Sequence, residues 1–244
     1  MDSLRDPVAS ASHFLMSFLA VVATAFMVRL AGGDRGRRLC VLIFGLSTIV
    51  LYAASGLYHS LRLPVEQLRL YQKIDMSAIF LLIAGSCMPT AGILLRGRFR
   101  AILLTGEWLF AAIGIASLWL LPKADHRLMV SIYAVMGWIG MAGVWQMWKA
   151  TGSWGLFWIC AGAFFYTLGA VIELANWPVL VPGVIRSHEL LHFCDMTGTA
   201  CHIVFVIKYA LPYRAPAVLG EDAEESEFAI PAPASVQAHA GTIG

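Results

Sequence analysis

The chain has 244 residues, of which 59% are hydrophobic and 13% charged, and its formal net charge is +2. A soluble domain of this length would be far less apolar, so the composition excludes a soluble globular protein and predicts a membrane protein. The arginine-rich links beside the apolar stretches are typical of topology signals and lipid-headgroup contacts. We therefore expect membrane lipids as partners and no nucleic acid.

Seven apolar stretches are each long enough to cross about 30 Å of hydrocarbon, which takes roughly 20 residues. They cover residues 12–30, 39–61, 74–95, 101–121, 128–148, 154–174 and 188–211. The first is preceded by Asp2, Arg5 and Asp6 and is followed by no convincing cleavage site, so we interpret it as a retained span. The pattern predicts an all-α, polytopic membrane protein, with a seven-transmembrane-helix bundle over residues 12–212 after a short N-terminal segment, 1–11.

The end of the chain has a different composition. It is rich in alanine and proline, has five acidic residues between positions 221 and 227, and contains no lysine or arginine after Arg214. Such a composition cannot bury a hydrophobic core. We expect residues 213–244 to form a disordered acidic tail.

Ionisable side chains interrupt three of the apolar stretches near one end. His59 closes the second stretch with Ser55 one helical turn earlier, Asp75 opens the third, and His188 and His192 open the seventh at a spacing of i,i+4. Because successive spans run in opposite directions, the three histidines and Asp75 are all expected within about two turns of the same membrane face. Ionisable groups inside a bilayer are costly, and they mark function by default.

Three imidazoles at one depth predict a metal site formed by His59, His188 and His192. Zinc is the favoured metal, because a catalytic zinc ion takes three protein ligands and keeps an open position for water. The alternative is that these side chains are interhelical hydrogen-bond partners, as Ser, Thr and His often are in membranes. We favour that alternative for Thr48 and Tyr52, which share a helical face with His59.

The combination of these motifs resembles the haemolysin-III family. Ser55 and His59 form S-x-x-x-H on the second span, Asp75 lies on the third, and His188 and His192 form H-x-x-x-H on the seventh. They are likewise similar to the adiponectin and progestin receptors. No single motif is specific, but the combination, in this order and on these spans, is quite specific.

The resemblance covers roughly residues 13–212 and implies both a site and an activity. The three histidines would hold zinc with water as the fourth ligand, Asp75 would hold or deprotonate that water, and Ser55 would be a polar neighbour. The implied activity is hydrolysis of a lipid amide of the ceramide type, with the lipid lying between the helices. Two other classes stay open: a receptor-like or cytolysin-type protein with a structural zinc, and a haem protein with axial histidines.

Other polar residues inside the spans are candidates for supporting roles. Asp195 lies one turn beyond His192 and is expected to hydrogen-bond either a ligating imidazole or an unrelated interior donor. His202 lies about 21 Å along the helix from His188, so we expect a buried hydrogen bond or a place in a substrate tunnel. Glu107 is expected to pair locally, and Glu173 to be solvated at the interface although it could reach the site. Three histidines receive no role: His13, His126 and His239.

The orientation in the membrane receives conflicting signals. Of the 17 lysines and arginines, seven fall on the side of the N-terminus and ten on the opposite side. The positive-inside rule therefore weakly favours an external N-terminus. The family that the motifs resemble places the N-terminus and the metal in the cytoplasm. Following the family, we expect a multi-pass protein of the plasma (inner) membrane with its metal site towards the cytoplasm.

Overall fold

The computed structural model describes residues 4–121, 125–182 and 184–214. Residues Met1–Tyr213 form one compact unit, and Arg214–Gly244 are a separate one. The predicted tail over 213–244 lies, except for its first two residues, outside the described part of the chain. Within the described residues there is no β-strand, and a single isolated bridge joins Val181 and Ile185.

The described chain is built from seven α-helices. They are α1 (Pro7–Leu30), α2 (Arg35–Ser60), α3 (Val65–Leu94), α4 (Gly97–Leu120), α5 (His126–Gly140), α6 (Val144–Ala175) and α7 (Ser187–Phe205). A short 3₁₀ turn, Met141–Gly143, joins α5 to α6, and a π-helical turn, Val206–Ala210, continues α7. The predicted all-α fold is confirmed.

Local sequence explains where several helices begin. Pro7 is the first residue of α1, a position where proline loses no hydrogen bond, so the helix begins within the predicted N-terminal segment 1–11. The Asp34 side chain caps α2 by accepting from the Arg37 backbone N–H at 3.0 Å. Before α7, the Glu189 carboxylate accepts from the Arg186 backbone N–H at 2.8 Å.

The fifth of six long apolar helical segments makes two passes. It covers His126–Ala175, 50 residues, which as a straight helix would measure about 75 Å, far more than a bilayer core. The backbone instead leaves helical geometry at Gly152 (φ 70°, ψ −174°). His126 Nε2 lies 2.8 Å from Glu173 Oε1, so the two ends of the segment lie side by side. The described residues therefore make seven passes, and the fifth and sixth passes are separated at Gly152, inside α6.

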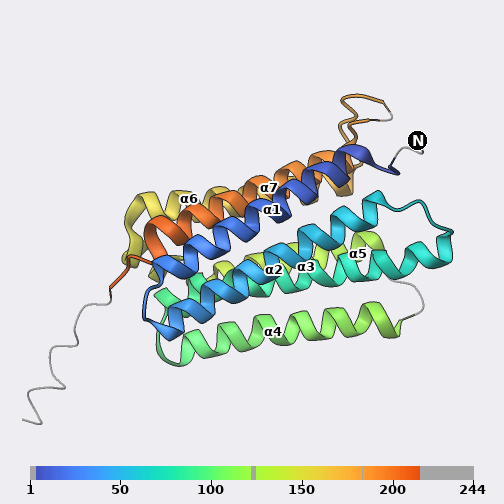
Figure 1. Cartoon of the computed structure of the whole chain (residues 1–244). Helices are drawn as coiled ribbons and strands as arrows, with labels where there is room; N and C mark the ends of the chain where they lie inside the picture. The colour runs from blue at the N-terminus through green and yellow to red at the C-terminus, as the bar shows by residue number, and fades with distance from the viewer. Residues whose placement is uncertain (1–3, 122–124, 183, 215–244) are drawn as a thin grey trace, which may run out of the picture. The chain divides into compact units, whose positions relative to one another are not determined.

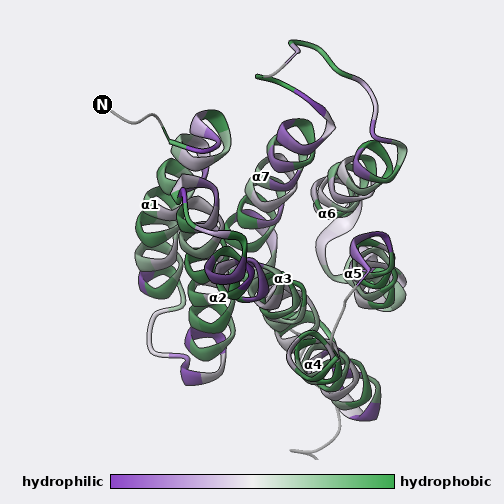
Figure 2. Cartoon of the chain, turned by 90° about the vertical axis from the view of Figure 1, so that its right-hand side faces the viewer, coloured by the Kyte–Doolittle hydropathy of each residue, from purple (hydrophilic) through white to green (hydrophobic). Residues whose placement is uncertain are grey.

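The passes pack around α3, which contacts α2, α4 and α5, while α1 contacts both α2 and α7 (Figures 1 and 2). Because successive passes run in opposite directions, the start of α1, the end of α2 and the starts of α3 and α7 share one end of the bundle. Buried apolar side chains of α2, α3 and α7 fill the centre, among them Phe44, Leu82 and Phe205. This topology brings the predicted site residues to the same end.

The outer surface of the bundle is apolar. Phe18 on α1 is 65% exposed and Leu120 on α4 is 81% exposed, and many other large hydrophobic side chains point outward. Figure 2 shows hydrophobic residues along α1 and α2 and hydrophilic residues gathered near their ends. An apolar patch of this extent is not found on a soluble monomer, and it suits contact with lipid. The protein is a multi-pass membrane protein.

Candidate metal centre

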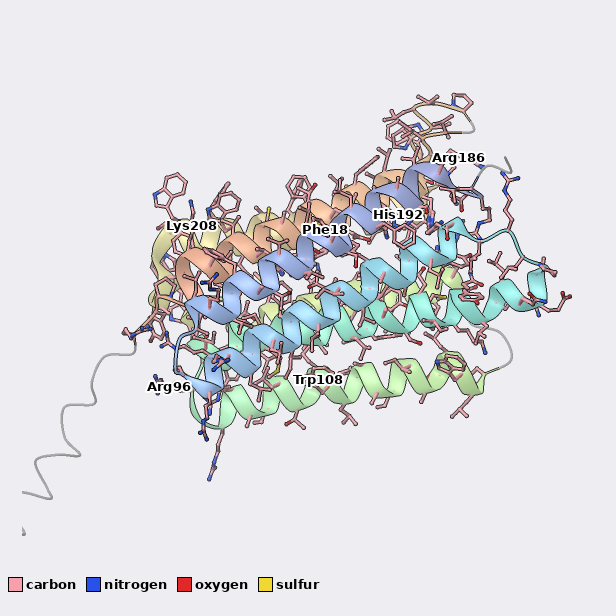
Figure 3. The ribbon with its side chains drawn as sticks, viewed as in Figure 1. Phe18, Arg96, Trp108, Arg186, His192 and Lys208 are labelled. Carbon is pink, nitrogen blue, oxygen red and sulfur yellow. The ribbon has the colours of Figure 1, made fainter. Side chains whose placement is uncertain are left out.

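Three imidazoles converge at one end of the bundle. His59 lies in the last turn of α2, and His188 and His192 lie in the first turns of α7. His192 Nε2 lies 3.2 Å from His59 Nε2 and 3.1 Å from His188 Nε2. His192 is on the Arg186 side of the bundle, away from Lys208 (Figure 3). The ligand atoms of all three residues lie within 4.8 Å of one another, so the cluster could hold a metal ion.

The spacing of these nitrogens suits a small tetrahedral ion. Ligand nitrogens at about 2.0–2.1 Å from such an ion lie roughly 3.4 Å apart, close to the two observed separations. His59 and His192 are buried and His188 is half-buried. A metal held there would be shielded from bulk water on most sides.

An aspartate that precedes α1 contacts His59. Asp6 Oδ2 lies 3.0 Å from His59 Nδ1, and Arg5 Nε donates to the same oxygen at 2.9 Å. The Asp6 backbone N–H also donates to the His59 carbonyl at 3.0 Å. Partial burial alone would raise the pKa of the Asp6 carboxyl, but the hydrogen bonds from His59 and Arg5 outweigh it and lower that pKa. Asp6 is therefore ionised at neutral pH beside the cluster.

A glutamate in the last turn of α6 contacts a second cluster histidine. Glu173 Oε1 lies 3.3 Å from His188 Nδ1 and 2.8 Å from His126 Nε2. Its side chain is only 9% exposed, so the expected solvated position at the interface is wrong. His126, for which the sequence predicted no role, shares this carboxylate.

Ser55 and Asp75 lie beside the cluster but outside its ligand group. The Ser55 hydroxyl donates a hydrogen bond to the buried Asp75 carboxylate, whose Oδ1 has no partner among the described residues. Because α3 begins at Val65, Asp75 lies well inside its helix rather than at the opening that the apolar stretch indicated. Asp75 and the cluster residues His188 and His192 line the same cavity.

His13 on α1 also belongs to this end of the bundle. Its ring is buried, and neither nitrogen has a hydrogen-bond partner among the described residues. The ring centroid lies 4.3 Å from that of His192 in an edge-to-face arrangement and 5.3 Å from that of Tyr52. In the sequence, the only indication that His13 lies near the cluster is its place close to the start of the first span, on the same side of the membrane as the site.

A cavity of about 230 Å³ leads from the cluster into the bundle. Its walls are mainly apolar, and they include both His188 and His202, which lie about 21 Å apart along the helix. His202 is buried and lines the cavity, and its ring also faces the backbone of Ile159, so the predicted tunnel position and the predicted buried hydrogen bond both stay open. Asp195 lines the cavity too, and the described contacts include no hydrogen bond from it to a cluster imidazole. Glu107, buried on α4, lacks the predicted local partner within the described chain.

The fold and this cluster define a polytopic helical membrane protein with three converging histidines. The model of the haemolysin-III related family matches residues 2–203, and the chain belongs to this family. It is 27% identical over 212 residues to Hemolysin-3 of Bacillus cereus, covering 86% of this chain and 94% of that protein. It is 26% identical over 214 residues to a Hemolysin-3 homolog of Bacillus subtilis (strain 168), covering 86% and 97%. The resemblance inferred from the motifs is confirmed.

Proposed function

We propose that the protein is a zinc-dependent membrane hydrolase that cleaves a lipid amide of the ceramide type. The observation that carries the proposal is the convergence of His59, His188 and His192 beside a buried carboxylate, Asp75, in the wall of an apolar cavity.

The donor set fits zinc. Imidazole nitrogens suit Zn²⁺, and three protein ligands with an open position are the ordinary arrangement of a catalytic zinc. His59, His188 and His192 would hold the ion through Nε2. Zinc bound by three histidines lowers the pKa of a bound water to about 7 and polarises a substrate carbonyl.

The chain's own residues would move the proton. Asp75 accepts a proton from the attacking water through its unpaired Oδ1 and delivers it to the leaving amine nitrogen. Ser55 keeps the carboxylate oriented by its hydrogen bond. Water adds to the carbonyl, the C–N bond breaks, and the products are a fatty acid and an amine.

The cavity supports a lipid substrate. Because its mainly apolar walls extend from His188 to His202, an acyl chain can lie between the helices while the amide stays at the cluster. The acyl chain would exchange the apolar bilayer interior for apolar cavity walls, so entering the cavity exposes none of its surface to water. We also propose that the protein lies in the plasma (inner) membrane with the cluster towards the cytoplasm.

Metal analysis and turnover test the proposal together. Detergent-purified native protein should carry about one zinc per chain and release fatty acid from a fluorescent ceramide. The His188→Ala/His192→Ala variant should lose both properties, whereas His239→Ala, in the tail, should keep them. Native protein without zinc, or zinc-loaded protein that cleaves no lipid amide in a broad panel, would overturn the enzymatic proposal.

A second candidate is a receptor-like or cytolysin-type protein in which zinc only ties α2 to α7. The names of the two Bacillus relatives favour a cytolysin. In that case, metal removal should lower the thermal stability and no lipid product should appear. Lysis of erythrocytes by the purified protein separates the cytolysin from the receptor-like protein.

A further inference from the structure

Two carboxylates that are not metal ligands contact the far side of two cluster histidines. Asp6 lies 3.0 Å from His59 Nδ1, and Glu173 lies 3.3 Å from His188 Nδ1. We propose that Asp6 and Glu173 are positioning residues, which hold the ring proton of each imidazole on Nδ1 and fix the orientation of the ring, so that Nε2 can bind the metal. This inference rests on the metal site of the proposed function.

The chemistry of imidazole explains why the far nitrogen matters. A neutral histidine carries one ring proton, on either Nδ1 or Nε2, and only the nitrogen without it can bind a metal. An ionised carboxylate only accepts hydrogen bonds, so it holds the proton on the nitrogen that it contacts. At both His59 and His188 that nitrogen is Nδ1. Arg5 Nη2 also lies near His59 Nδ1, but at 3.4 Å it is farther away than the Asp6 carboxylate at 3.0 Å. Both Nε2 lone pairs are then directed towards His192. Carboxylates in this position also raise the basicity of a ligating imidazole.

The position of Asp6 is built by several contacts. Arg5 donates to its carboxylate at 2.9 Å, and the Arg5 guanidinium lies 4.3 Å from the centre of the Tyr58 ring. The Asp6 backbone N–H donates to the His59 carbonyl, and the Ser10 hydroxyl donates to the Gly56 carbonyl at 3.3 Å. Arg5 and Asp6, which precede α1, and the first turn of α1 are thereby fastened to the end of α2. Arg5 and Asp6 belong to the site although no span contains them.

Glu173 is placed by a different set of elements. It lies in the last turn of α6, and its Oε1 is shared by His188 on α7 and His126 at the start of α5. Its Oε2 is buried without a partner among the described residues. A buried carboxylate is costly unless it is paired. Two imidazoles supply that pairing, and they fix the carboxylate against His188.

In the described part of the chain the third histidine, His192, is held without a carboxylate, so the inference applies to His59 and His188 alone. The described contacts give His192 no carboxylate, and its ring packs instead against the edge of His13, with the centroids 4.3 Å apart. Removing the two acids should therefore disturb two ligands and leave the third in place. Weaker metal binding with a retained site is the expected result, rather than complete loss.

The experiment measures metal binding by the full chain in detergent. Asp6→Ala and Glu173→Ala should each weaken Zn²⁺ binding about 10–100-fold in competition with a chelator. Both should also change the visible absorption of bound Co²⁺, which reports ligand geometry. Asp6→Asn and Glu173→Gln keep an oxygen acceptor without the charge, so they should recover part of the affinity. Glu66→Gln, which removes an exposed acid at the start of α3, should bind like the native chain.

The outcomes separate this inference from the proposed function. If the native chain binds neither Zn²⁺ nor Co²⁺, the metal site itself is wrong and the inference fails with it. If the native chain binds metal and both alanine variants show the same affinity and the same Co²⁺ spectrum, the inference is overturned and the metal site stands. If an alanine variant does not fold, the comparison of the Asn or Gln variant with the native chain decides, and unchanged affinity and spectrum there overturn the inference.

Discussion

The residues at the cluster form two groups: the histidines, whose ring nitrogens face one another, and Asp75, whose carboxylate has an oxygen unpaired within the described chain. The Nε2 atoms of the three histidines face one another, whereas Asp75 Oδ1 is buried without a partner among the described residues. A buried acceptor without a partner is costly unless water or a ligand satisfies it. Asp75 is therefore suited to hold the attacking water of the proposed reaction, and it is not needed to hold the metal.

Asp75→Asn tests this division. The variant should retain the zinc content of the native chain, because the three histidine ligands are untouched. Its turnover of a fluorescent ceramide should fall about 10²–10⁴-fold, the range ascribed to general acid–base catalysis. Glu107→Gln is the matched control, since Glu107 is a buried acid on another helix that does not line the cavity. Unchanged turnover in Asp75→Asn would remove Asp75 from the mechanism.

The sequence predicts some of these residues and misses others for a physical reason. His59, His188 and His192 stand inside or at the edge of apolar stretches, and the number of intervening spans alone brings them to one face. Asp6 and Glu173 lie at span ends, where a polar side chain is normally solvated. Their contacts depend on how α1 meets α2 and how α6 meets α7, which spacing along one helix does not specify.

Pairs of helices are held together by close backbone approaches. At Gly45 on α2, an added Cβ would lie 2.7 Å from Thr24 Cβ on α1. Thr24 cannot easily turn away, because its hydroxyl donates to the Ala20 carbonyl at 2.6 Å. Small residues at such positions let membrane helices pack by van der Waals contact, which replaces the hydrophobic drive of water. This contact places α1, and with it Asp6, against α2.

Gly45→Ala should therefore push α1 away from α2. Overpacking of this kind costs about 1–3 kcal/mol, and the expected result is a lower midpoint of thermal unfolding in detergent. Gly106→Ala is the control, because an added Cβ there meets nothing within 4 Å and alanine is the better helix former. A Gly45→Ala variant as stable as that control would show that the pair can repack without loss.

The boundaries of the helices show how far an apolar stretch predicts an element. The third stretch begins near residue 74, but α3 begins at Val65, since its first turns are helical although they carry several polar residues. The division near residue 150 was predicted as a link between two spans. In the structure this link is a single residue, because within α6 only the backbone of Gly152 leaves helical geometry.

Gly152→Ala tests the chain reversal. The φ of +70° with a ψ of −174° is a region that essentially only glycine adopts, so a side chain should cost about 1–3 kcal/mol in strain. The expected result is a lower unfolding midpoint than that of the Gly106→Ala control. Open space surrounds Gly152, with nothing within 4 Å of an added Cβ, so the loss would come from the backbone and not from a clash. An unchanged midpoint would argue against the reversal as described.

At the scale of the whole bundle, the two ends differ in chemistry. One end carries the histidines with Asp6, Asp75 and Glu173, and the opposite end carries Arg96 and Lys208 (Figure 3). Ten basic residues are assigned to that opposite end and seven to the histidine end. Arg37 is one of the ten. Its guanidinium donates to the Leu211 and Tyr213 carbonyls and thereby fastens α2 to the end of the last helix. At least one of the ten therefore has a packing role, which weakens the charge count as a guide to orientation.

We predict that the histidine end faces the cytoplasm. With seven passes, the N-terminus and the link at Asp125 then lie inside and residues after Tyr213 lie outside. An alkaline phosphatase fusion at Gly244 should be active, because that enzyme folds in an oxidising compartment. The same reporter inserted after Asp125 should be inactive. The three-residue excess of basic residues at the other end is small enough for helix packing to override, and the acids of the tail contribute little to topology. The reverse pattern of activity would place the cluster on the outer face, where a lipid amide would have to reach it from the other leaflet.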